Sequence, residues 1–250
     1  MKPAWAAFTL PVALAAVVIG AACTTSGGGF NPRVAQWEAR YQDARLGQVT
    51  PAQLLREVGL QVDLIPPGRF GRGRFRPMRP TYITIHSTQN YTGNAYNHAL
   101  ALKRGALRAT RRPGGNRIGF LTWHFTVQDD VAIQHLPCRE QGEHADFDGP
   151  GNNKSIGIEM CEHRGNDLAL TIDKTARLTA YLMRAYGIPL SHVVPHYHWP
   201  RISPAIKDPH KNCPHFLLDN GRPGPTWQWF LRRVHFHHNR LLPEAARPLG

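Results

Sequence analysis

The segment HVVPHYHWPRISPAIKDPHKNCP, residues His192–Pro214, gathers imidazole, amine and thiol groups within a stretch rich in proline. Its first part, through His198, predicts a strand that is followed by a loop. Histidine and cysteine side chains are the ligands that a borderline-soft ion such as Zn²⁺ prefers. Catalytic zinc usually has three protein ligands and one open position. His196 and Cys213 therefore predict a metal site that needs a third ligand from elsewhere in the chain.

Two histidines of this segment compete for one ligand position. On a strand, His196 and His198 would face the same side, so the spacing leaves open which of them binds the metal. We expect the third ligand to be His86, which ends the apolar segment YITIH at Tyr82–His86. The carboxyl ends of strands in α/β sheets form the crevice where ligands bind, and His86 and His196 are both expected at such ends.

A carboxylate is expected beside these ligands. The segment SIGIEM, residues Ser155–Met160, predicts a strand whose side chains alternate, so Gly157 and Glu159 share one face. Burying a carboxylate at the end of an apolar strand is costly unless it has a partner. One interpretation of Glu159 is a structural ion pair with an arginine, and the other is a base beside the predicted metal.

The order of the expected elements indicates the fold class. Apolar residues at helical spacing predict helices, and β-branched or alternating segments predict strands. The expected helices are Pro32–Arg45, Pro51–Gly59, Asn94–Leu107, Leu170–Tyr186 and Thr226–Leu242, and the expected strands are Tyr82–His86, Phe120–Val127, Val131–Leu136, Ser155–Met160 and His192–His198. We expect Tyr96 and Leu100 to share one apolar face of the third helix, and a polar turn at Arg111–Asn116. Interleaved helices and strands predict an α/β fold, a central mixed β-sheet with helices on both faces.

The first residues have the pattern of an export signal. Lys2 precedes an uncharged run that is rich in alanine, valine and leucine, and Cys23 follows small residues in a sequence that resembles a bacterial lipobox. We predict a signal peptide over residues 1–22, a lipid on Cys23 and a flexible tether over residues 23–31. A transmembrane anchor is disfavoured because the apolar run is short and a glycine-rich segment follows it. Beyond the tether we expect a helical extension over residues 32–60, the main domain over 61–222, and a final helix and tail over 223–250.

Charge and cysteine content narrow the partners further. The formal net charge of +13 favours an anionic partner, and an exported protein meets the acidic cell wall and lipid headgroups, so we expect no nucleic-acid partner. The arginine-rich segment Pro66–Pro80 predicts a solvated loop, with contact to anionic glycan or lipid as the alternative. Cys138 and Cys161 could form a disulfide in an oxidising compartment or remain buried thiols, and their spacing leaves both open.

Five motifs in a fixed order carry a family resemblance. They are ITIHS at Ile83–Ser87, TWHFTV at Thr122–Val127, GEHA at Gly142–Ala145, NNKSIGIEMCE at Asn152–Glu162 and KNCPH at Lys211–His215. Each motif alone is weak evidence, but five motifs in the order in which one family has them make a chance match improbable. Together they resemble the zinc-dependent N-acetylmuramoyl-L-alanine amidases of the phage-lysozyme and peptidoglycan-recognition superfamily.

The resemblance implies roles for individual residues. It implies that the Zn²⁺ ligands are His86, His196 and Cys213. Glu159 would handle the proton, Lys211 would stabilise the developing oxyanion, and His124 and His144 would line the substrate groove. We interpret Trp123, next to His124, as a core residue.

The resemblance also implies an activity and a location. The expected reaction is hydrolysis of the amide bond between N-acetylmuramic acid and L-alanine in peptidoglycan or muropeptides. The alternative is a non-catalytic peptidoglycan-binding module of the same superfamily. We expect a monomer held in the cell envelope by its N-terminal lipid, at the outer membrane and facing the periplasm.

Overall fold

The computed structural model describes residues 31–109, 118–200 and 209–250. The predicted signal peptide, Cys23, the tether up to residue 30 and the turn expected at Arg111–Asn116 lie outside the described residues. In the described part of the chain, six strands form one sheet in the order β1-β4-β3-β5-β2-β6. Only β3 and β4 pair antiparallel, so the sheet is mixed. The strands are β1 (Leu60–Val62), β2 (Tyr82–Ser87), β3 (Phe125–Val127), β4 (Ala132–Gln134), β5 (Ser155–Met160) and β6 (Val193–Pro195).

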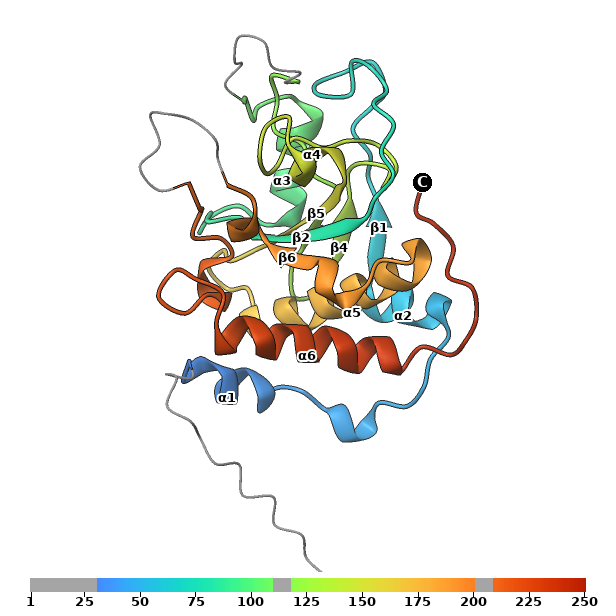
Figure 1. Ribbon diagram of the computed structural model, residues 1–250, viewed down its shortest axis with the longest axis vertical. Coiled ribbons are helices and arrows are strands. Elements are labelled where there is room, and N and C mark those ends of the chain that lie inside the picture. The colour runs from blue at the N-terminus through green and yellow to red at the C-terminus, as the bar shows by residue number, and fades with distance from the viewer. Residues whose placement is uncertain (1–30, 110–117, 201–208) are drawn as a thin grey trace, which may run out of the picture.

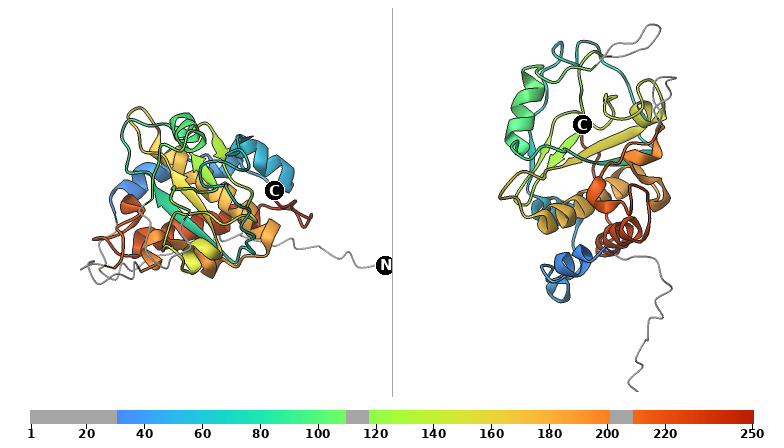
Figure 2. Two further views of the ribbon diagram at one scale, coloured as in Figure 1. Left: turned by 90° about the horizontal axis from the view of Figure 1, so that it is seen from above. Right: turned by 90° about the vertical axis from the view of Figure 1, so that its left-hand side faces the viewer.

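Helices cover both faces of this sheet, which confirms the predicted fold class. α5 (Leu168–Tyr186) lies against one face and α6 (Pro225–Asn239) packs on α5, whereas α3 (Ala95–Lys103) lies on the other face (Figure 1). The right-hand view of Figure 2 shows the same layers, with green α3 on one side of the sheet and red α6 on the other. The remaining elements are α1 (Arg33–Glu38), α2 (Pro51–Val58), α4 (Pro150–Asn153) and the 3₁₀ turns η1 (Asp43–Arg45), η2 (Leu190–His192), η3 (His196–His198) and η4 (His215–Leu217). Over the described residues, no helix combines the length and apolar character that crossing a membrane requires.

The two central strands present one apolar face and one polar face. β2 and β5 are parallel neighbours, and His86 lies opposite Glu159 in their register. Because side chains alternate along a strand, the isoleucines of both strands share the opposite face. These isoleucines are fully buried in the same core as α5: Ile83, Ile85, Ile156 and Ile158. Burying each contributes roughly 1.5–3 kcal/mol, so the apolar face fixes which side His86 and Glu159 face.

Three helix boundaries agree with local signals in the sequence. Thr50 caps α2 with its side chain in a reciprocal capping box, and Pro51 occupies the first helical position. Gly59 and Gly187 end α2 and α5 with φ values of 67° and 66°, which glycine adopts without a steric penalty.

Several sequence-based expectations were wrong in detail. The helix expected over Pro32–Arg45 ends at Glu38, and the strand expected over Phe120–Val127 begins only at Phe125. Tyr96 and Leu100 are 47% and 42% exposed, because α3 packs against the sheet through its small residues Ala95 and Ala99 instead. The strand expected over His192–His198 is shorter, since β6 ends at Pro195 and a 3₁₀ turn follows. His196 and His198 therefore do not lie on a strand, so the alternation that would place them on one face does not apply.

The residues before β1 are part of the main core. Val34 and Trp37 of α1 are buried, and the Trp37 ring lies 5.4 Å from that of Trp229 in α6. Asp43 pairs with Arg233 of α6, and Arg233 also donates to Asp173 of α5 at 2.5 Å. The N-terminal extension is thus attached to the outer helices by both apolar and charged contacts.

The structure also distinguishes the two alternatives for the cysteines. Cys138 and Cys161 are both free thiols, and both are fully buried. They belong to separate apolar clusters, with Cys138 in the main core and Cys161 beside α3. The two residues therefore pack as small apolar side chains.

Candidate metal centre

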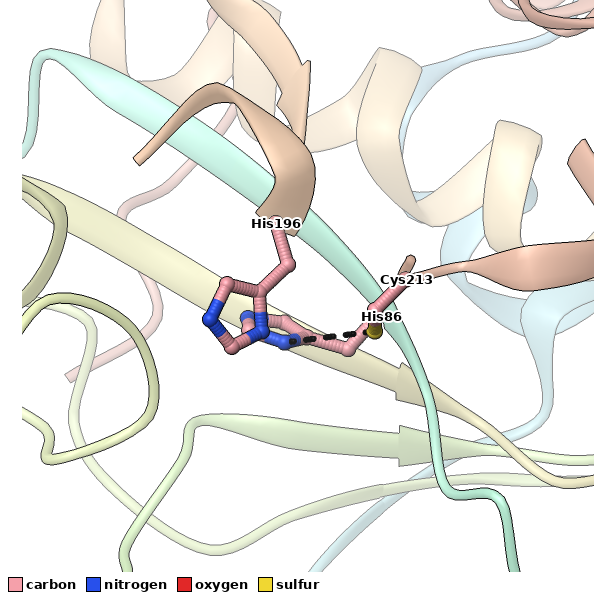
Figure 3. Close-up of side chains that lie close together, drawn as sticks. All are labelled: His86, His196 and Cys213. Atoms are coloured by element: carbon pink, nitrogen blue, oxygen red, sulfur yellow. Dashed lines mark hydrogen bonds between the residues drawn. The ribbon is translucent and has the colours of Figure 1, made fainter. Parts of the chain in front are cut away.

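Three side chains from distant parts of the sequence converge at the carboxyl end of β2. His86 is the next-to-last residue of β2, and His196 begins the η3 turn directly after β6. Cys213 comes from the loop before η4. Their ligand atoms all lie within 4.8 Å of one another, and Figure 3 shows both imidazole rings beside the thiol. All three side chains are buried, so they form a group that could hold a metal ion.

The Cys213 thiol is oriented by the backbone of β2. The Ser87 N–H donates to Sγ at 3.3 Å, and Sγ lies 4.0 Å from His86 Nδ1. Burial and the negative charge of Glu159 raise the pKa of Cys213 to about 12, against the opposing charge of Lys211. Without a cation the group is a neutral thiol, so binding a metal would release its proton.

The orientation of His86 is fixed through a second histidine. Nε2 of His144 lies 3.3 Å from the Ser155 carbonyl oxygen, which can only accept, so Nε2 carries the hydrogen and Nδ1 is an acceptor. That acceptor lies 3.1 Å from His86 Nε2, which must then donate. The remaining lone pair of His86, on Nδ1, faces Cys213. Burial, followed by the neighbouring His196 and His144, lowers the pKa of His86 well below its usual value, so the ring is neutral, as metal binding requires.

The two histidines expected to line the groove have different surroundings. His144 borders a pocket of about 220 Å³ that His196 and Lys211 also line, so it can meet a substrate as well as orient His86. His124 is fully buried, and its Nδ1 accepts from the Gly157 N–H at 3.0 Å while Nε2 donates to the Glu140 carbonyl at 2.9 Å. Burial lowers its pKa to about 4. Both ring nitrogens of His124 are thus engaged within the protein, and its contact with substrate stays a prediction.

Glu159 and Lys211 add an acid–base group and a positive charge. Glu159 Oε1 lies 3.8 Å from His86 Nδ1. Burial raises the pKa of Glu159 to about 7, although the ammonium group of Lys211 opposes the shift. A carboxyl group with a pKa near neutrality can both accept and release a proton. Lys211 also borders the 220 Å³ pocket, so its charge is available to a group bound there.

The structure separates the two competing histidines of η3. His196 is buried among the candidate ligands, whereas His198 is exposed and packs against Tyr82, with 6.2 Å between ring centroids. The group that could hold a metal contains His196 and excludes His198. Geometry therefore favours His196 in the ligand position.

The donor set fits a zinc ion. In a tetrahedral site with ordinary zinc bond lengths, a nitrogen and a sulfur ligand lie about 3.6 Å apart. His86 Nδ1 and Cys213 Sγ are 4.0 Å apart, so small side-chain rotations would complete the shell. Two imidazoles and one thiol leave a fourth position open, as catalytic zinc sites do.

Gly157 has a role that sequence reasoning missed. A Cβ atom at this position would lie 2.8 Å from three atoms of the His144 ring. Only glycine therefore lets that ring lie against β5, where it reaches both Ser155 and His86. A glycine inside a strand often marks such a close approach, and this signal could have identified the contact.

The fold and the site together define a class of protein: an α/β protein with a buried His-His-Cys group that could hold a metal ion beside a carboxyl group. The family model for N-acetylmuramoyl-L-alanine amidase (Amidase_2) matches residues 76–216. The chain belongs to this family.

Relatives and solved structures agree with this membership. The N-acetylmuramoyl-L-alanine amidases XlyA and CwlH of Bacillus subtilis (strain 168) are 38% and 36% identical over 176 and 181 residues, which is 69% and 71% of this chain. The matches cover 50% of XlyA and 61% of CwlH, so the chain spans only part of these curated relatives. The catalytic domain of XlyA superimposes with a TM-score of 0.56 at 36% identity, covering 70% of this chain and 99% of that domain. The Staphylococcus aureus hydrolase AmiA, with a TM-score of 0.51 at 13% identity over 80% of this chain and 100% of that one, supports the fold alone.

Proposed function

We propose that this chain is a zinc-dependent enzyme that cleaves the amide bond between N-acetylmuramic acid and L-alanine in peptidoglycan or its fragments. The observation that carries the proposal is the convergence of His86, His196 and Cys213 within 4.8 Å, beside Glu159. Family membership supports the choice of bond, as does the name N-acetylmuramoyl-L-alanine amidase of XlyA and CwlH.

The side chains around the centre divide the chemistry among them. Zn²⁺ held by the three ligands would supply a nucleophile from water at neutral pH and polarise the amide carbonyl. Glu159 accepts the proton of the attacking water and returns it to the leaving amine. Lys211 stabilises the negative charge that develops on the carbonyl oxygen, and loss of one such group typically costs about 10²–10³-fold in rate. His144 keeps the His86 lone pair directed at the ligand position.

The main alternative is a module that binds peptidoglycan without cutting it. Such a module needs no complete ligand set, whereas this chain brings three ligands together and places a carboxyl group next to them. Metal analysis of the purified protein tests the difference. A protein that binds no zinc would favour the binding module.

Digestion of purified cell-wall sacculi tests the reaction directly. We expect new N-terminal L-alanine residues and intact N-acetylmuramic acid, both identified by mass spectrometry. Glu159→Gln should still bind zinc and should lose most of the turnover, because the amide cannot accept the water proton. Cleavage by Glu159→Gln at the parental rate would show that the base is another group.

The location of the protein is a further part of the proposal. We propose that residues 1–22 are a signal peptide and that lipid on Cys23, followed by a tether over 23–31, holds a monomeric enzyme at the outer membrane. Residues 32–60, 61–222 and 223–250 would be the extension, the amidase domain and the final helix with its tail. Cys23→Ser should move the protein from the membrane fraction to the soluble periplasm, and unchanged fractionation would contradict the anchor.

A further inference from the structure

A second pocket begins two residues after Cys213. It has a volume of about 250 Å³. Its lining includes the polar residues Arg33, Tyr91, Glu162 and His215 and the apolar residues Leu168 and Phe216. Arg33 belongs to α1, whereas the family model covers only residues 76–216. One wall of this pocket therefore comes from a part of the chain outside the family match.

A chain of short contacts links the pocket to the metal centre. Ser87 donates its N–H to Cys213 Sγ at 3.3 Å, and its hydroxyl lies 3.4 Å from His215 Nδ1. His215 Nε2 lies 3.4 Å from Glu162 Oε2, and the Gln89 N–H donates to Glu162 Oε1 at 2.6 Å. A ligand in this pocket would thus lie one layer of side chains from the candidate zinc.

The same contacts determine which charge the pocket can bind. Both oxygens of Glu162 already have partners, and its side chain is only 7% exposed, so it offers little to a cation. The Arg33 guanidinium forms no ion pair with any described residue, and Tyr91 is 59% exposed. Two exposed donors line a pocket whose one carboxylate, Glu162, is largely covered by protein. This arrangement fits an anion with an apolar stem.

Arg33 is also held in place by its helix. Val34 and Trp37 bury the other side of α1 in the main core, and the Arg33 backbone N–H donates to Asn31 Oδ1 at 3.0 Å. The guanidinium therefore projects from a fixed backbone.

We propose that this pocket binds the terminal carboxylate of the substrate's peptide, with Arg33 and Tyr91 as its donors. The identity of the peptide rests on the proposed function, but the preference for a carboxylate does not. Substrate selection would then come partly from the N-terminal extension. Because Arg33 is exposed, we expect its contribution to be modest, about 2–5-fold in affinity.

Binding to an enzyme that cannot turn over tests the proposal. In a Glu159→Gln background, titration calorimetry would compare N-acetylmuramoyl-L-alanyl-D-glutamyl-L-lysine with the same compound amidated at its terminal carboxylate. We expect the acid to bind about 2–5-fold more tightly. Adding Arg33→Gln should abolish this difference by weakening only the acid. Arg45→Gln is the matched control, because Arg45 is an exposed arginine of the same extension, its side chain donates to Gln42 at 3.3 Å, and it does not line this pocket.

The outcomes separate the two proposals. Equal binding of acid and amide, or an acid preference that survives Arg33→Gln, would overturn the carboxylate pocket. Failure of the parental enzyme to cut sacculi would instead overturn the proposed reaction, and the binding comparison would still decide the pocket. Tyr91→Phe provides a second measurement, since loss of one hydroxyl from an exposed residue should reduce the acid preference without affecting folding.

Discussion

Replacing His144 by phenylalanine removes the acceptor for the His86 Nε2–H group and keeps a ring over Gly157. The donor is then buried without a partner, which costs about 1–3 kcal/mol. His86 can avoid this cost by rotating its ring or by moving its hydrogen to Nδ1. Either change takes away the lone pair that faces Cys213. We therefore expect zinc affinity to fall about 10–100-fold, as when a metal-binding histidine loses the group that orients it.

Competition with a chromophoric chelator measures this affinity on metal-free protein to which zinc is added. His144→Asn should lose less, because an asparagine oxygen can occupy roughly the place of the imidazole Nδ1 and accept the same hydrogen. His198→Phe is the matched control, since His198 is exposed and lies outside the ligand group. Thermal unfolding of each metal-free variant shows whether it is folded before zinc is added.

The reasoning fails if folded His144→Phe binds zinc as tightly as the parent. It also fails if His144→Asn is as weak as His144→Phe, because the effect would then come from packing and not from the accepted hydrogen bond.

Three further predictions concern the ligand, the sheet and pH. His196→Ala should abolish stoichiometric zinc binding and His198→Ala should not, as measured by metal analysis; the reverse would exchange their roles. Gly157→Ala should destabilise the fold by about 1–3 kcal/mol and weaken zinc binding, because the added Cβ would lie 2.8 Å from the His144 ring. The control is Gly47→Ala, whose Cβ would have no atom within 4 Å, and urea unfolding should show no change in its stability. Burial lowers the pKa of His124 from about 6.5 to about 4, so its contribution is present above pH 6.5 and is lost as the pH falls. Between pH 7 and pH 5 that loss is about 2 kcal/mol. Because Glu159 and other buried histidines also titrate, the measurement compares the parent with His124→Gln, both metal-free, and a variant that keeps the parental pH dependence of the unfolding free energy would contradict the assignment.

The central strands and the candidate metal ligands could be predicted from the sequence because short local patterns of residues indicate both. The alternation in Ser155–Met160 fixes which face Glu159 occupies, and the glycine after α5 marks where that helix ends. His86, Cys213 and one histidine of η3 could be named because few residue types bind zinc. Their convergence within 4.8 Å is the part that only the fold supplies.

Other features depend on contacts between distant segments. The direction in which His144 donates is set by the Ser155 carbonyl, and no local pattern shows which carbonyl a histidine will meet. The sequence of α6 has the pattern of an ordinary amphipathic surface helix. His237 is nevertheless fully buried on it, and its Nε2 lies 2.7 Å from Asp173 of α5. Tyr96 was expected inside because helical spacing shows a stripe but not which neighbour covers it.

The packing of the N-terminal extension limits how this protein can be recombined with others. Residues 33–58 lie outside the family match at 76–216, yet α1 and α2 contribute to the core that α5 and α6 share. A chimera joined at residue 76 would leave Trp229 and its neighbours facing water and would also lose Arg33. A chimera that transfers this amidase domain should therefore begin at residue 33 and not at residue 76.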